Sequence, residues 1–137
     1  MAFLIDTSIF IGLERRTLGV ASLEAVVPYP DDRVALASIT ASELLAGVHR
    51  ADSESRRQRR HIFVEAILES MPILTFDLRT ARTHAQFWTK LMQSGQTIGA
   101  HDLLIAATAL SHGYEVLSEN LRDFQRVPDL IMRQPRW

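Results

Sequence analysis

The sequence contains no cysteine. Disulfide bonds, thiolate zinc sites and cysteine nucleophiles are therefore excluded from its chemistry. Long hydrophobic runs are also missing: apolar stretches such as residues 103–107 are far shorter than the roughly 20 residues that cross a bilayer. We find no basic segment followed by an apolar core, which is the pattern of a secretion signal. We expect a cytoplasmic protein without a membrane partner.

Lysine is almost absent, since Lys90 is the only one among 15 Lys and Arg residues. The planar arginine side chain suits phosphate recognition. A GC-rich genome also favours arginine codons, and we attribute most of the bias to that cause. The net charge of −1 gives no indication of a nucleic-acid partner.

Strand-like and helix-like segments alternate along the 137 residues. At 47% hydrophobic residues, this length predicts a single domain, residues 1–137, with a substantial core. The segments predicted as strands are nearly continuous apolar runs, which is typical of parallel strands buried on both faces. They are residues 3–5, 34–38, 71–76, 114–118 and 130–132. The pattern predicts an α/β fold with a central, mostly parallel sheet of four to five strands and helices on both faces.

The segments between these strands have helical spacing. We expect helices from residue 9, over 18–27, 40–51 and 53–70, from residue 77 onward, and over 100–112, where Gly113 ends the last one. In the helix after Asp77, the apolar spacing predicts an inward face made of Ala81, Ala85, Trp88, Leu91 and Met92. Residues 28–32 predict a turn, and residues 119–124 a loop.

Four acidic residues lie at the starts of predicted helices: Asp6, Glu43, Asp77 and Asp102. Each has an ordinary structural explanation. Residues 40–43 match the capping box, in which the glutamate accepts a hydrogen bond from the backbone amide of the N-cap residue. Asp77 is placed as an N-cap, and the charge of Asp102 complements the helix dipole.

Distance separates a set of caps from a catalytic cluster. Helices that follow parallel strands all begin at the same edge of the sheet, so both kinds of acid would lie there. Caps are scattered along that edge, whereas catalytic carboxylates converge. Convergent carboxylates repel one another unless a cation lies between them, and would therefore imply a metal ion.

The order of several short motifs resembles the PIN domains, specifically the VapC-like toxins of bacterial type II toxin–antitoxin pairs. The resemblance covers nearly the whole length. No motif is specific alone, but together they are. They are Leu4-Ile5-Asp6-Thr7-Ser8, Ser42-Glu43-Leu44 with Gly47, Asp102-Leu103-Leu104-Ile105-Ala106-Ala107, Leu117-Ser118-Glu119-Asn120, Asp123-Phe124 and Val127-Pro128.

The resemblance implies a metal-dependent endoribonuclease that acts as a toxin. Asp6, Glu43 and Asp102 match the family's three principal acids, which hold Mg²⁺ or Mn²⁺; such hard oxygen donors suit these ions better than zinc. Asn120 matches the fourth catalytic position, with Asp123 as the alternative. An ion held there would activate water for phosphodiester hydrolysis.

Hydroxyl groups are expected to support these acids. Ser118 stands where the family more often has threonine, and its hydroxyl would orient a metal-bound water. Thr7 and Ser8 are expected to hold the carboxylate of Asp6. His101 is the nearest histidine in sequence, but a neighbouring helix position points to a different face, so we expect no direct role for it.

The run Arg56, Arg57, Arg59 and Arg60 has two interpretations. It could form a phosphate-binding rim for RNA beside the acids. It could equally be a solvated helix face neutralised by Asp52, Glu54 and Glu65. Repulsion between like charges at this spacing does not stabilise the helix.

The family resemblance also implies protein partners. A VapB-like antitoxin is expected to bind beside residues 9–27 and to place a basic side chain near the acids. A homodimer is expected, assembling with antitoxin into a heterotetramer or a larger complex. Two other functions stay open: a non-catalytic RNA-binding module, and a phosphatase of the haloacid-dehalogenase type. The phosphatase is disfavoured because that chemistry needs an acid two residues after Asp6, where this chain has Ser8.

Overall fold

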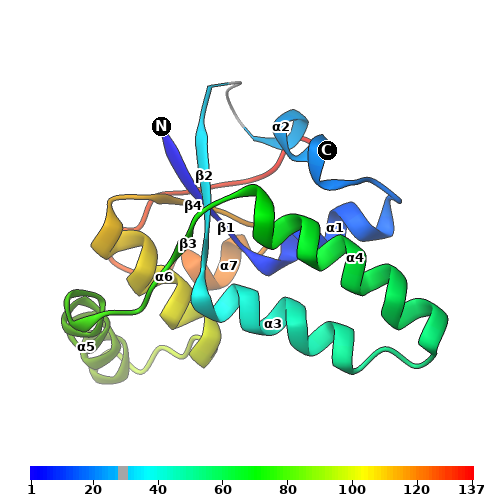
Figure 1. The fold of residues 1–137 in the computed structure, drawn as a ribbon. Helices are drawn as coiled ribbons and strands as arrows, with labels where there is room; N and C mark the ends of the chain where they lie inside the picture. The colour runs from blue at the N-terminus through cyan, green and yellow to red at the C-terminus, as the bar shows by residue number, and fades with distance from the viewer. Residues whose placement is uncertain (28–30) are drawn as a thin grey trace.

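A five-stranded sheet forms the centre of the protein in the computed structural model, which describes residues 1–27 and 31–137 (Figure 1). All neighbouring strands of this sheet pair in parallel, which confirms the predicted α/β class. β1 lies in the middle, with Leu4 opposite Ala35 on one side and Val116 on the other. The strand order is β3 (Ile73–Leu74), β2 (Arg33–Ala37), β1 (Ala2–Ile5), β4 (Glu115–Leu117) and β5 (Met132–Arg133).

Helices cover both faces of the sheet, as predicted. The described residues form α1 (Thr7–Arg15), α2 (Leu23–Val26), α3 (Ser38–His49), α4 (Glu54–Ser70), α5 (Leu78–Gln93), α6 (Ala100–His112) and α7 (Leu121–Phe124). Figure 1 shows α5 and α6 on one side and α1, α2 and α4 on the other. In this described part of the chain, none of the helices is both long and apolar enough to span a membrane.

Alternating side chains of β1 divide the core in two. Phe3 and Ile5 point into one cluster with residues of α1, α2, α3 and α4. Leu4 points into the other cluster, with residues of α5, α6 and α7. All three side chains are completely buried. Burial on both faces explains why this strand is a continuous apolar run.

Two segments differ from their predicted structure. Residues 18–27 form a short 3-10 helix, Val20–Ser22, followed by α2, rather than one continuous helix. The predicted loop at residues 119–124 contains α7, whose Phe124 is completely buried. Burial of this side chain stabilises a short helix that the local sequence pattern does not predict. The predicted turn at residues 28–32 falls largely on residues 28–30, which lie outside the described residues.

The predicted inward face of α5 was right for Leu91 and wrong for Trp88 and Met92. Trp88 is 47% exposed and Met92 is 60% exposed, while Thr80, Phe87 and Leu91 are buried. α5 packs along α6 through a hydroxyl pair, with Thr80 Oγ1 2.8 Å from Ser111 Oγ. Two apolar stripes therefore run along this helix, and packing against α6 selects the one that contains Phe87.

α3 begins two residues earlier than predicted, at Ser38. Ala37 occupies the N-cap position and makes no side-chain capping bond. Thr40 therefore lies inside the helix, where its side chain is buried and its hydroxyl oxygen has no hydrogen-bond partner among the described residues. The predicted capping box was wrong, and Glu43 lies in the second turn, available for other contacts.

Candidate active site

The central strands deliver polar residues to one edge of the sheet. Asp6 follows β1, and Ser118 follows the neighbouring strand β4. The Asp6 amide continues the ladder by donating to the Leu117 carbonyl at 3.0 Å. Asp6 is only 5% exposed, which is unusual for a carboxylate and requires partners.

Those partners are hydroxyl groups. The Ser118 hydroxyl donates to Asp6 Oδ2 at 2.7 Å, and the Ser8 hydroxyl donates to the same oxygen at 2.8 Å. The Ser8 amide also donates to Oδ2, at 3.4 Å, so Asp6 caps α1 as well. The predicted contact of Ser8 with the Asp6 carboxylate is present. Asp6 is thus a helix cap whose side chain is held both by Ser8 of α1 and by Ser118, which follows β4.

Glu43 is held by a different pair. The Thr7 hydroxyl donates to Glu43 Oε1 at 2.9 Å. The expectation that Thr7 holds the Asp6 carboxylate was therefore wrong. His101 Nδ1 lies 3.4 Å from Glu43 Oε2. The packing of α6 against α3 thus brings His101 beside one of the acids, whereas the expectation that it has no direct role stays a prediction. Sequence offers no signal for this contact.

Asn120 connects the remaining acids. Its side-chain amide donates to Asp102 Oδ2 at 3.1 Å and to Asp123 Oδ2 at 3.2 Å. Its backbone amide donates to the Ser118 hydroxyl at 2.8 Å, which joins this group to Asp6. Both candidates for the fourth position, Asn120 and Asp123, therefore lie beside Asp102.

The electrostatics show that these carboxylates influence one another. Burial, followed by the negative charges of Asp6, Asp123 and Glu43, raises the pKa of Asp102 to about 6. His101 acts in the opposite direction. The negative charge at this edge is therefore only partly compensated by the protein's own cations.

Asp77 has no part in this group. Its Oδ1 accepts from the Thr80 amide at 2.9 Å and the Thr80 hydroxyl at 3.0 Å, at the start of α5. These hydrogen bonds lower the pKa of Asp77. The prediction of Asp77 as an N-cap is confirmed.

The carboxylates of this edge are chemically suitable ligands for a divalent ion, but they lie too far apart to share one. Within residues 1–27 and 31–137, no three His, Asp or Glu side chains are grouped closely enough to hold an ion as they stand. However, every side-chain hydrogen bond of Asp6 and of Asp102 with a described residue ends on Oδ2, which leaves Oδ1 of each for another ligand. Hard oxygen donors with excess negative charge suit Mg²⁺ or Mn²⁺. Sharing one ion would require the side chains to move together.

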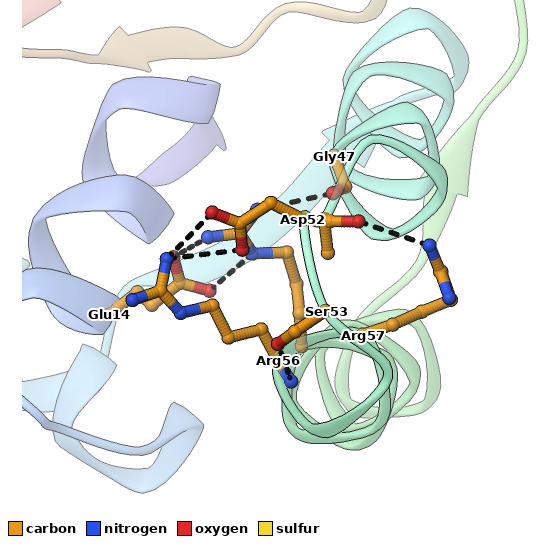
Figure 2. A network of polar contacts seen from close by, with 8 residues as sticks. Glu14, Gly47, Asp52, Ser53, Arg56 and Arg57 are labelled. Carbon is orange, nitrogen blue, oxygen red and sulfur yellow. Dashed lines mark hydrogen bonds and ion pairs between the residues drawn. The ribbon is translucent and has the colours of Figure 1, made fainter.

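The arginine run on α4 is largely neutralised by the chain's own acids (Figure 2). Arg56 Nη1 lies 3.0 Å from Asp52, and Arg57 Nη1 lies 2.7 Å from Glu54. Arg60 reaches α1, where its Nη2 lies 2.9 Å from Glu14. Of the four, only Arg59 makes no ion pair with a described residue. The structure favours the interpretation as a neutralised helix face, although Glu65 takes no part in these pairs.

A cleft of about 270 Å³ lies between α1, α3 and α4. Its walls include the apolar side chains of Phe10, Ile11 and Phe63 and the ion pair of Glu14 with Arg60. Glu43 also lines it, so the cleft is continuous with the edge that carries the acids. This position lies beside α1, within the region expected to receive a protein partner.

The family is decided by comparison with known proteins. A family model described as PIN domain matches residues 3–130, which include all the acids of this edge. The chain belongs to the PIN-domain family. Ribonuclease VapC of Rickettsia bellii is 38% identical to this PIN domain over 130 residues, which cover 95% of the chain and 93% of the relative. The tRNA(fMet)-specific endonuclease VapC of Salmonella typhimurium is 32% identical over 98 residues, 72% of each protein.

Solved structures of VapBC proteins also resemble this PIN domain. VapBC2 from Rickettsia felis, bound to a DNA fragment from its promoter, superposes with a TM-score of 0.81 at 25% identity and 98% coverage of both chains. The likeness therefore extends over nearly the whole chain. The predicted resemblance to VapC-like PIN domains is confirmed.

Proposed function

We propose that this PIN domain is a metal-dependent endoribonuclease and the toxin of a VapBC-like pair. The observation that carries the proposal is the meeting of Asp6, Glu43 and Asp102 at one edge, with the pKa of Asp102 raised to about 6. Relatives of similar length are named ribonuclease VapC. A cytoplasmic location, where RNA is present, fits this function.

The acids of this edge would bind the metal ion, and their polar neighbours orient the acids. Asp6, Glu43 and Asp102 would hold Mg²⁺ or Mn²⁺, which when bound neutralises phosphate charge and lowers the pKa of water. Ser8 and Ser118 fix the rotamer of Asp6. Asn120 orients Asp102, just as Thr7 orients Glu43.

Cleavage of total RNA with Mg²⁺ or Mn²⁺ tests this proposal. Asp6→Asn and Asp102→Asn should each reduce the cleavage rate by about 100-fold or more, because each removes a negative oxygen donor while keeping the side-chain shape. The matched control is Asp77→Asn, which changes an acid outside the site and keeps a good N-cap. Cleavage at the wild-type rate by folded Asp6 and Asp102 variants would refute the nuclease mechanism.

The two alternatives give different results in the same assay. A non-catalytic RNA-binding module would retain RNA in a gel-shift assay and cleave nothing with either ion. A phosphatase would hydrolyse phosphate monoesters. The second is disfavoured because the Ser8 hydroxyl, two residues after Asp6, is used to hold the Asp6 carboxylate.

The cleft between α1, α3 and α4 is the surface that best fits an antitoxin. It combines apolar walls with the acidic Glu14 and Glu43. An amphipathic segment with a basic residue would match both properties. Since Glu43 also belongs to the catalytic edge, such a segment would block the site directly. Solved relatives are complexes of VapB with VapC, which supports a partner of this kind.

A second copy of the chain is proposed to cover α5. Leu78, Trp88 and Met92 are exposed on one side of that helix. With Ala81 and Ala85 they repeat at intervals of three and four residues, the spacing of helices that pack side by side. A stripe of this kind on a soluble domain marks a protein interface.

A further inference from the structure

A second, open cleft adjoins the acids at Asn120. Its volume is about 650 Å³, and its walls come from the loop before α6 and from α7 with the residues after it. Asn120 and Asp123 line it and also contact each other. Because Asn120 bonds directly to Asp102, this cleft begins at the catalytic edge. The remaining lining residues are Thr97, Ile98, Gly99, Arg122 and Arg126.

Arg122 and Arg126 make this cleft different from the α4 surface. Arg122 is exposed and makes no ion pair with any described residue, whereas Arg56, Arg57 and Arg60 are all paired with acids. Arg126 is half-buried, and its Nη1 donates to the Thr97 carbonyl at 2.8 Å. That bond positions the guanidinium group and uses one of its five N–H donors.

Asp123, the one acid among the described residues that line the cleft, does not neutralise these arginines. It accepts a hydrogen bond from Asn120, on the side of the catalytic acids, and makes no ion pair with a described residue. The two guanidinium groups therefore face the open volume with donors to spare. An elongated anion that enters the cleft would meet both.

We propose that Arg122 and Arg126 bind a backbone phosphate of single-stranded RNA next to the bond that is cut. The inference rests on the proposed nuclease function and identifies its substrate-binding residues. A site with four carboxylates repels a polyanion, so the substrate must be held by cations close by. Arg122 and Arg126 follow Asn120 by two and six residues and share its cleft, which places them within one or two nucleotides of the acids.

Binding to RNA in EDTA tests the proposal separately from cleavage. The probe is a labelled single-stranded RNA of about ten nucleotides, and the full chain is titrated at several salt concentrations by fluorescence anisotropy. Arg122→Ala should weaken binding roughly 5- to 10-fold and reduce the slope of log affinity against log salt by about 0.7, the loss of one phosphate contact. Arg126→Lys should weaken binding less, because it keeps the charge and loses the planar fork.

The matched control is Arg59→Ala, since Arg59 is also exposed and makes no ion pair with a described residue, but lies on α4. Its affinity should stay within about twofold of wild type, as expected for a charge away from the bound strand. Equal losses for Arg122→Ala and Arg59→Ala would overturn the proposal. So would unchanged RNA affinity for Arg122→Ala together with weaker binding of a co-expressed protein partner, which would make the cleft a protein-binding surface.

The two proposals fail in different ways. If wild type binds the RNA through Arg122 but cleaves nothing with Mg²⁺ or Mn²⁺, the nuclease mechanism is wrong and the phosphate site stands. If wild type cleaves and Arg122→Ala binds as wild type does, the phosphate site is wrong and the nuclease mechanism stands.

Discussion

Asp6 combines two roles that sequence patterns treat as alternatives. It caps α1 through the Ser8 amide, and it is buried at the edge where Asp102 and Glu43 lie. Both roles use the same oxygen, Oδ2, so capping does not consume the whole carboxylate. A residue can therefore satisfy the rule for an N-cap and still belong to the proposed catalytic group.

Asp102 should destabilise the fold at neutral pH. Its folded pKa of about 6 lies above its ordinary value, so the folded state binds more protons than the unfolded state and stability falls as pH rises from about 4 to 6. Asp102→Asn removes this cost and can still accept the Asn120 hydrogen bond. One pKa unit is worth about 1.4 kcal/mol, and because the group is half-exposed and screened, we expect a gain of about 1 kcal/mol.

Urea unfolding of wild type and Asp102→Asn in EDTA measures this gain. The stability difference should be present at pH 7.5 and vanish at pH 4, where Asp102 is protonated in the folded state. A difference that is the same at both pH values would mean that the charge of Asp102 is not its cause.

α5 depends on a cap that stands apart from the active site. Asp77→Ala removes both hydrogen bonds to Thr80 and should lower the melting temperature, while RNA cleavage per folded molecule stays unchanged. Asp77→Asn is the matched control, because asparagine caps as well as aspartate. Since the pKa of Asp77 is lowered, its contribution is present above the ordinary aspartate range and is lost as pH falls through the folded value.

Thermal unfolding followed by circular dichroism distinguishes these variants. The melting temperatures of Asp77→Ala and wild type should converge in acid. If Asp77→Asn melts as early as Asp77→Ala, then the side chain contributes through its charge rather than as a hydrogen-bond acceptor.

The assembly of the whole molecule is tested at the exposed stripe of α5. Met92→Glu should convert the proposed homodimer to a monomer in light scattering after size exclusion, because it places a charge on an apolar contact. Ile62→Glu is the control: Ile62 is 69% exposed and lies on α4, away from α5. A wild-type protein that stays monomeric at every concentration, or a dimer that Met92→Glu leaves intact, would contradict the proposal.

The sequence by itself determined the fold class, because each strand and helix carries its own periodicity. Apolar runs such as residues 3–5 predict strands buried on both faces, and the turn at Gly113, with φ of +74°, ends α6 where the glycine predicts it. Position at the end of a strand or the start of a helix selected Asp6 and Asp102 from the sequence, but it selected the N-cap Asp77 as well, so the proposed catalytic acids were told apart by the family resemblance.

Only the tertiary structure decided which side chains meet. Thr7 with Glu43, His101 with Glu43, and Arg60 with Glu14 are contacts between separate elements, so no local pattern contains them. The buried stripe of α5 was decided in the same way, by its contact with α6. Sequence periodicity reports the apolar faces of one element, whereas pairing of charges and choice between two faces depend on the position of its neighbours. The arginines on α4 allowed two interpretations from the sequence, and only the structure showed that three of them, Arg56, Arg57 and Arg60, are paired with acids.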